Sequence, residues 1–196
     1  MQKLGGGYEG KPSIFDDIDK EDIIMCFFPC TRFEDQILLS FRGEQYQDRT
    51  LTDLSKLERC IKLHGELHEN YTLICMLMII CIKKELKIVF ENPYSVQHYL
   101  QRYWCLKPQI IDKDRTRDGD YYVKPTQYFF VGFSPKNNLV LEPLEFVKKY
   151  NIEKGGVEGI SCTTARSMIH PQYASRFIKK YLIDYETDIN TLFGIS

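Results

Sequence analysis

Hydrophobic residues in this chain gather in short continuous runs and in one long helical stripe. Two runs, at residues 23–28 and 87–90, have the length of buried strands. Between them, apolar residues recur at steps of three and four from residue 54 to residue 86, which predicts a long helix. Ser55-x-x-Glu58 has the pattern of a capping box at the start of that helix. A strand, a helix and a strand in this order predict a right-handed crossover and a parallel pair of strands.

Weaker patterns on either side complete a single α/β domain over residues 13–196. Residues 109–133 predict an antiparallel hairpin that closes the sheet, which helices would cover on both faces. Residues 1–12 are polar and rich in glycine, and are expected to be a flexible segment. The other expected elements are a short strand at 13–15, a polar loop at 31–50, helices at 95–104 and 171–182, and a loop at 134–160 with one helix near 142–150.

The composition is that of an ordinary soluble globular protein. The 196 residues are 43% hydrophobic and 27% charged, which suits one domain with a substantial core. A formal net charge of −1 gives no global basic field that would indicate nucleic acid, although a local basic groove is still permitted. The seven cysteines are irregularly spaced, which favours reduced thiols and a cytoplasmic location. The longest apolar run, residues 73–82, is about half of what a membrane span needs, so no membrane association is expected.

Two apparent motifs are not expected to carry chemistry. Residues 5–11 match the start of a phosphate-binding P-loop, but Pro12 stands where that motif needs a hydroxyl group, and no strand precedes it. Cys60, His64 and His68 share one helical face, yet no acidic partner pattern accompanies them. The sequence therefore predicts neither a P-loop nor a metal site.

Two polar side chains follow the two predicted parallel strands. Cys30 comes after Phe-Phe-Pro, and Glu91 begins Glu-Asn-Pro. Reacting groups in open α/β sheets collect beyond the carboxyl ends of the strands, so we expect Cys30 and Glu91 at the same edge. Chemistry at a pyrimidine ring requires such a pair, because a thiolate adds to carbon 6 while an acid holds ring nitrogen 3. Two structural alternatives stay open: a cysteine that fills the core, and a Glu-Asn-Pro segment that leaves the strand as a turn.

The two motifs resemble those of the cytosine-5 DNA methyltransferases of phages and bacteria. Residues 27–30, F-F-P-C, are similar to the Pro-Cys motif of that family, residues 90–93 to its Glu-Asn motif, and residues 113–117 to its Gln-x-Arg-x-Arg segment. The resemblance implies a Rossmann-like methyltransferase sheet, DNA as the partner and S-adenosylmethionine as the cofactor. The site that it implies consists of Cys30 as nucleophile, Glu91 as acid, Arg115 and Arg117 near the base and the thiol, and Ile14, Asp17, Phe28 and Pro29 at the cofactor.

Parts of the family pattern have no counterpart here. Nothing before residue 13 can form the glycine-bearing strand–loop–helix that holds the cofactor, so a fold truncated at its N-terminus is expected. Methyl transfer would then need a partner chain that carries the cofactor loop, and a homo-oligomer is the other possible assembly. No stretch is long enough for a separate target-recognition domain. If Cys30 is a nucleophile, Arg32 or Arg117 is the expected neighbour that favours its thiolate.

Three functions therefore stay open for this chain. The first is an S-adenosylmethionine-dependent DNA cytosine methyltransferase. The second is a non-catalytic or split methyltransferase fragment that needs a partner chain. The third is an unrelated α/β binding module in which Cys30 is buried.

Overall fold

The computed structural model describes residues 13–28, 30–34, 37–145 and 167–183. The expected N-terminal segment 1–12 lies outside these residues, as does most of the helix expected near 142–150. Contacts within the chain divide the described residues into two compact units. The first contains the residues up to Asp112 together with Pro125–Ser134, and the second contains Lys113–Lys124 and the residues from Pro135 onward. Each unit is described by itself.

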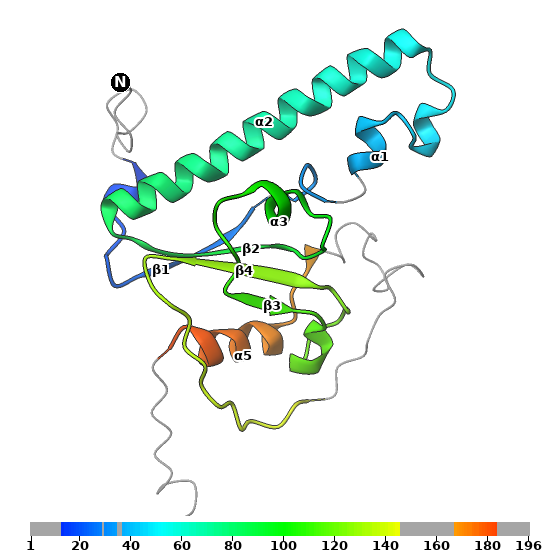
Figure 1. Ribbon diagram of the computed structural model, residues 1–196. Coiled ribbons are helices and arrows are strands. Elements are labelled where there is room, and N and C mark those ends of the chain that lie inside the picture. Colours follow the sequence, from blue (N-terminus) through cyan, green and yellow to red (C-terminus); the bar gives the residue numbers. More distant parts are fainter. Residues whose placement is uncertain (1–12, 29, 35–36, 146–166, 184–196) are drawn as a thin grey trace, which may run out of the picture. The chain divides into compact units, whose positions relative to one another are not determined.

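The first unit is built on one open, mixed sheet of four strands (Figure 1). Its strands are β1 (Ile23–Phe27), β2 (Lys87–Pro93), β3 (Ile110–Asp112) and β4 (Thr126–Val131), in the spatial order β1-β2-β4-β3. The pair β1 and β2 is parallel, whereas β4 runs antiparallel to both β2 and β3. The predicted mixed α/β architecture is confirmed in this respect, including the parallel pair and the antiparallel hairpin.

The crossover between β1 and β2 contains a single long helix, α2 (Asp53–Lys84). Its N-cap is Thr52, whose hydroxyl oxygen accepts a hydrogen bond from the backbone N–H of Ser55 at 3.3 Å. The helix therefore starts before the capping box predicted at Ser55, because a threonine oxygen can satisfy one of the first N–H groups. Gly65 lies inside the helix without dividing it. Glu85 ends the helix in the left-handed conformation, with φ of 57°.

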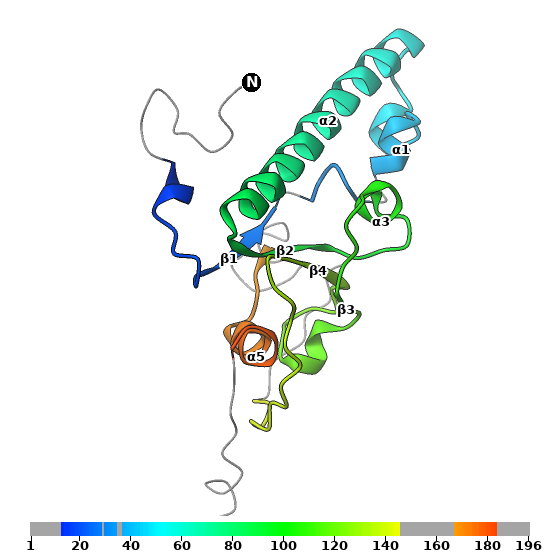
Figure 2. The same ribbon diagram turned by 60° about the vertical axis from the view of Figure 1, so that its left-hand side comes forward.

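The core lies between the sheet and the two helices on one of its faces, α2 and α3 (Tyr99–Tyr103) (Figures 1 and 2). Phe90 in β2 is at its centre, with ring centroids 5.8 Å from Phe28, 5.8 Å from Trp104 and 5.6 Å from Phe129. These separations are typical of packed aromatic pairs. The α2 residues that join this core are Leu67, Ile74, Met78 and Cys81.

Only one stripe of α2 is buried. Leu73 and Ile82, at the two ends of the apolar run 73–82, are 58% and 57% exposed, so the helix buries one face alone against the sheet. The first half extends beyond the sheet and contacts α1 (Ile37–Phe41) (Figure 2). By length and composition α2 could cross a membrane, which is weak evidence because core helices of soluble proteins meet the same criterion.

Two of the sequence predictions in the N-terminal region are wrong. Residues 13–15, predicted as a strand, contain instead the 3-10 helix η2 (Ile14–Asp16). The Ser13 hydroxyl accepts from the N–H of Phe15 and the Asp16 carboxylate accepts from the N–H of Ser13, so this short turn satisfies its own polar groups. Residues 31–50 are not a plain loop, because they contain α1 and the 3-10 helix η3 (Tyr46–Asp48).

Strand pairing moves two other boundaries. Residues 91–93, predicted to lie beyond the strand, are part of β2, because Asn92 and Pro93 pair with Gln127 and Thr126 of β4. A proline is tolerated there because it is the last residue of the strand. Tyr121 and Tyr122, predicted in the next strand, precede β4, and Tyr122 is buried in the second unit.

Replacement of glycine by alanine is expected to have opposite effects on the free energy of unfolding at two positions. Gly132 has φ of +84°, and a methyl group on it would overlap the backbone carbonyl oxygen of Leu86. Gly132→Ala is therefore expected to cost about 2–4 kcal/mol in free energy of unfolding, from backbone strain and overlap together. Gly65→Ala adds its methyl group to an open helix surface and is expected to gain about 0.5–1 kcal/mol. Urea unfolding of both variants checks this, and equal signs would contradict it.

The second unit joins the 3-10 helix η4 (Arg115–Asp118) to α5 (Pro171–Tyr181). The predicted helix at 171–182 is confirmed, with proline in its first turn and His170 as the N-cap. Tyr173 and Phe177, one turn apart, are both buried. Asp120 accepts a hydrogen bond from the backbone N–H of His170 at 3.0 Å, so it links the η4 region to the start of α5.

Candidate functional site

The register of the parallel pair β1 and β2 determines where Cys30 and Glu91 lie. Phe27, the last residue of β1, is paired with Glu91 of β2. Cys30 comes three residues after Phe27, so both groups belong to the carboxyl-terminal edge of the sheet. The predicted placement at one edge is therefore confirmed, although Glu91 lies within β2 and not beyond it.

The segment that carries Cys30 is anchored by a buried aromatic residue. The backbone N–H of Phe33 donates to the carbonyl of Cys30 at 2.8 Å, which forms a turn directly after the strand. The Phe33 side chain is fully buried, 6.0 Å from the ring of Tyr99 and 6.3 Å from that of Phe28. The N–H of Tyr99 donates to the Phe33 carbonyl at 2.9 Å, so α3 holds the turn from the other side. Cys30 is half-buried on this fixed turn.

A carboxylate that the sequence prediction missed lies beside the thiol. The Cys30 Sγ donates to Glu34 Oε1 at 3.0 Å. The only sequence feature that links Glu34 to Cys30 is their spacing of four residues, and many pairs of residues that do not interact have the same spacing. Arg32, predicted as a cationic neighbour of the thiol, pairs instead with Glu66 of α2 at 2.5 Å. A negative charge next to the sulfur disfavours the thiolate, because two like charges would face each other.

Glu34→Gln is expected to speed alkylation of Cys30 by iodoacetamide about tenfold at pH 7.5. This factor corresponds to removing about 1.4 kcal/mol of repulsion between the carboxylate and the thiolate. Exposed Cys105 provides the internal control, and its rate should not change. Burial raises the pKa of the Cys26 and Cys81 thiols, which keeps both of them slow to react. Peptide mass spectrometry follows each cysteine separately, and a slower Cys30 in the variant would mean that Glu34 acts as its base.

Buried polar side chains hold the end of β2. Glu91 and Asn92 are buried, and so is Gln127 on the neighbouring strand β4. The Gln127 amide donates to the carbonyl of Pro93 at 2.7 Å and lies 3.2 Å from Nδ1 of His98. These contacts join the end of β2 to the start of α3, so the carboxylate of Glu91 extends from a braced strand end.

The two arginines of the predicted site belong to the second unit. Arg115 is fully buried, forms an ion pair with Asp120, and places its guanidinium 4.6 Å from the centre of the Tyr173 ring. These contacts hold η4 against α5 within that unit. Arg117 has an 84% exposed side chain and lies 3.6 Å from Asp114. A role for either arginine at the base stays a prediction.

Two of the residues predicted to hold S-adenosylmethionine, Ile14 and Asp17, lie away from Cys30. Ile14 and Asp17 flank Asp16, which pairs with Lys84 in the last turn of α2, just before β2 begins. They therefore lie at the amino-terminal end of the parallel pair, whereas Cys30 lies at its carboxyl-terminal end. The hydrogen bond from Lys84 lowers the pKa of the Asp16 carboxyl group.

Only one of the other two predicted cofactor residues can be placed. Phe28 packs on Phe33 and Phe90 as part of the core, and Pro29 lies outside the described residues. The three described members of the predicted cofactor set therefore do not come together at the edge that carries Cys30 and Glu91, and S-adenosylmethionine as cofactor stays a prediction.

The face of α2 that carries Cys60 and His64 was not expected to bind a metal ion. No group of three His, Cys, Asp or Glu side chains in the described ranges could hold a metal ion. His64 stacks on the ring of Phe41 at 4.5 Å, and the Cys60 thiol donates to the Phe41 carbonyl at 3.0 Å. Both side chains thus help to pack α1 against α2.

Comparisons of the chain with protein-family models, curated proteins and solved structures found no match. The geometry of Cys30, Glu34 and Glu91, together with the motifs that contain Cys30 and Glu91, is therefore the basis for a function.

Proposed function

We propose that this chain carries out the base-activating chemistry of a cytosine-5 DNA methyltransferase, with Cys30 as nucleophile and Glu91 as acid. The single observation that supports this most is the β1–β2 register, which pairs Phe27 with Glu91 and brings both motifs to one edge of the sheet. The parallel pair followed by an antiparallel hairpin also agrees with the part of a Rossmann-like methyltransferase sheet that the motifs imply.

The chemistry assigned to these residues is a reversible addition. The Cys30 thiol gives its proton to water, and the thiolate forms a bond to carbon 6 of cytosine while the double bond between carbons 5 and 6 becomes a single bond. Glu91 donates a proton to ring nitrogen 3, which neutralises the developing charge. Carbon 5 becomes electron-rich and takes a proton from water. Reversal releases the original hydrogen of carbon 5, the thiolate and the proton on nitrogen 3.

S-adenosylmethionine is the methyl donor that the motifs imply, and it would supply an electrophilic methyl group to carbon 5. Ile14 and Asp17 lie at the other end of the strands and Phe28 packs against the core, so the chemistry proposed for this chain stops at the reversible addition. Calorimetric titration with S-adenosylmethionine is a separate measurement. A saturable binding heat would mean that residues other than these hold the cofactor.

The test uses the full chain alone, without a methyl donor. Incubated in D2O with a single-stranded oligonucleotide that contains cytosine, it is expected to exchange the hydrogen on carbon 5 for deuterium. Mass spectrometry of the digested nucleosides measures this as added mass on deoxycytidine but not on thymidine. A duplex of the same sequence should exchange more slowly, because extruding the base costs a few kcal/mol. Hydrogen exchange at carbon 5 that is no faster than in buffer would rule out this function.

The runner-up is a non-catalytic α/β module in which Cys30 has a structural part. The hydrogen bond from its thiol to Glu34 favours this alternative, because a thiol that donates to a carboxylate keeps its proton and is a poor nucleophile. In that case the chain would exchange no hydrogen, and Cys30→Ala would lower the free energy of unfolding by about 1 kcal/mol through the lost hydrogen bond.

A further inference from the structure

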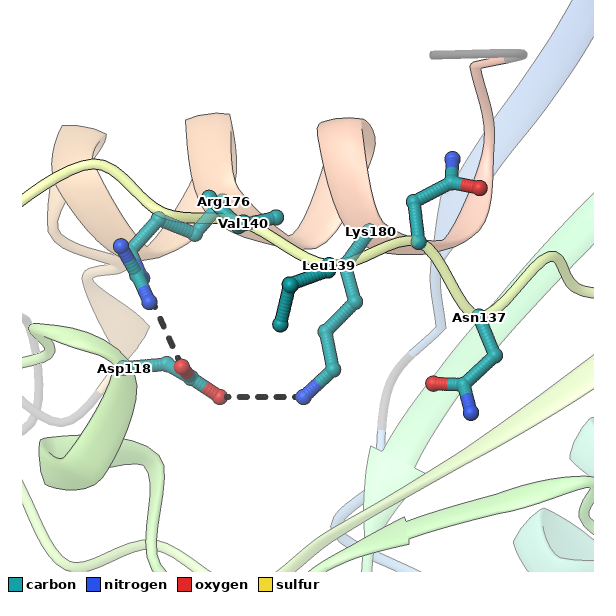
Figure 3. Close-up of a pocket in the computed structure, with 7 residues that line it drawn as sticks. Asp118, Asn137, Leu139, Val140, Arg176 and Lys180 are labelled. Carbon is teal, nitrogen blue, oxygen red and sulfur yellow. Dashed lines mark hydrogen bonds and ion pairs between the residues drawn. The ribbon is translucent and has the colours of Figure 1, made fainter. Parts of the chain in front are cut away.

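The second unit contains a charged pocket that takes no part in the chemistry assigned to Cys30 and Glu91. Its volume is about 330 Å³, which is the lower end of the range for small-molecule sites. Asp118 at the end of η4, a loop segment at residues 137–140, and Arg176 and Lys180 on α5 line it. Figure 3 shows both cationic side chains extending from the helix toward Asp118, with Leu139 and Val140 on the loop that runs beside the helix.

Backbone contacts hold the loop wall of this pocket in place. The Asn138 side-chain amide donates to the carbonyl of Lys179 at 2.9 Å and to that of Ile183, and the N–H of Asn138 donates to the carbonyl of Lys180 at 2.9 Å. The N–H of Lys136 donates to the carbonyl of Tyr181 at 2.9 Å. The loop thus satisfies carbonyl groups that the end of an α-helix leaves without intrahelical partners. The pocket is therefore preformed, which lowers the entropic cost of binding.

The charges in the pocket are not balanced. Asp118 is the single carboxylate among the lining residues, and it lies 3.5 Å from Nε of Arg176 and 3.8 Å from Nζ of Lys180. Charge-assisted hydrogen bonds are shorter, at about 2.7–2.9 Å, so neither cation is tightly engaged by Asp118. Arg176 is also held by the carbonyl of Glu142, to which its Nη1 donates at 2.8 Å. The Arg176 side chain is only 14% exposed, so its charge is poorly screened by solvent.

We propose that this pocket binds the phosphate group of a small phosphate monoester. Arg176 and Lys180, one helical turn apart on the same face of α5, would both contact the dianion. Among the lining side chains, two are cationic and one is a carboxylate, so the lining itself attracts an anion. The volume exceeds what a bare phosphate needs, and Leu139 and Val140 provide an apolar wall for the organic part of the ligand. This inference does not depend on the function proposed for Cys30.

The experiment is isothermal titration of the full chain with ribose 5-phosphate at constant ionic strength, alongside ribose and inorganic phosphate. Ribose 5-phosphate is expected to bind at least tenfold more tightly than inorganic phosphate, and ribose is expected not to bind. Arg176→Gln and Lys180→Gln should each weaken binding about tenfold. Lys179→Gln is the matched control, because Lys179 is the adjacent cation on α5 but pairs with Glu142 and does not line the pocket.

Three results would overturn the phosphate site. One is no binding heat with 10 mM ribose 5-phosphate. Another is an equal loss of affinity in Lys179→Gln and Lys180→Gln, since that would report general attraction between charges. The third is equal affinity for inorganic phosphate and ribose 5-phosphate, which would exclude an organic ligand. Circular dichroism of each variant establishes that it is folded, and Lys180→Gln carries the test if Arg176→Gln unfolds.

Discussion

Replacing Cys30 by alanine is expected to reduce hydrogen exchange at carbon 5 of cytosine to the rate in buffer. Without the thiol no bond can form to carbon 6, so carbon 5 never becomes electron-rich. Cys30→Ser is expected to be nearly as inactive, because a serine hydroxyl is a far weaker nucleophile than a thiolate. Deuterium content of deoxycytidine, measured by mass spectrometry over time, gives the rates.

Glu91→Gln separates the acid from the nucleophile in the same assay. The substitution keeps the shape of the side chain but removes the proton that would be donated to nitrogen 3. Positioned acids contribute roughly 10²–10⁴-fold to such steps, and a loss of this size is expected. Alkylation of Cys30 should continue in this variant, which shows that the thiol itself is intact.

Cys105→Ala is the matched control for these variants. Cys105 is an exposed thiol, and its removal is expected to leave the exchange rate unchanged. If Cys105→Ala loses exchange, or if Cys30→Ala keeps it, the nucleophile has been misassigned. If the unmodified chain exchanges hydrogen but Glu91→Gln is as fast, Glu91 is not the acid.

Phe90→Ala is expected to lower the free energy of unfolding by about 3–5 kcal/mol. The Phe90 ring is fully buried and packs on three other aromatic rings, so truncation removes apolar burial and leaves a cavity. A loss of this size is a large fraction of the total stability of an ordinary domain. Urea unfolding followed by circular dichroism measures it. Phe90→Leu, which keeps most of the volume, is expected to cost much less and covers the case in which the alanine variant does not fold.

Phe27→Ala provides the same chemical change at an exposed position. Phe27 lies in β1 and is 58% exposed. The expected cost is under about 1 kcal/mol, because most of its surface already contacts water. Equal losses in Phe27→Ala and Phe90→Ala would mean that the core is not centred on Phe90.

The hydrophobic pattern alone determined the central frame of the first unit. Short apolar runs at 23–28 and 87–90, joined by a long helical stripe, were enough to predict β1, α2 and β2 and their parallel pairing, because crossovers of this kind are right-handed and buried strands are continuous in hydrophobicity. Since Cys30 follows β1 by three residues and Glu91 lies near the end of β2, their common edge was also predictable.

Element boundaries required tertiary or local polar contacts that a hydrophobic pattern does not contain. β2 continues through Asn92 and Pro93 because β4, more than thirty residues away in the sequence, supplies hydrogen-bond partners there. The predicted strand at 13–15 became η2 because Ser13 bonds to the backbone of the same turn. Nothing in the hydrophobic pattern indicates these hydrogen bonds, which decide where each element ends.

Tertiary structure alone decided the surroundings of the charged groups. The sequence predicted a thiol nucleophile with a cationic neighbour, but folding brings Arg32 to Glu66 of α2 and leaves Glu34 beside the sulfur. Asp118 and Arg176 are 58 residues apart and share a pocket only because η4 packs against α5. Apolar periodicity is a local property that the chain carries in its sequence. A charged side chain, in contrast, takes the partner that folding brings within a few ångströms, and that partner can come from any part of the chain.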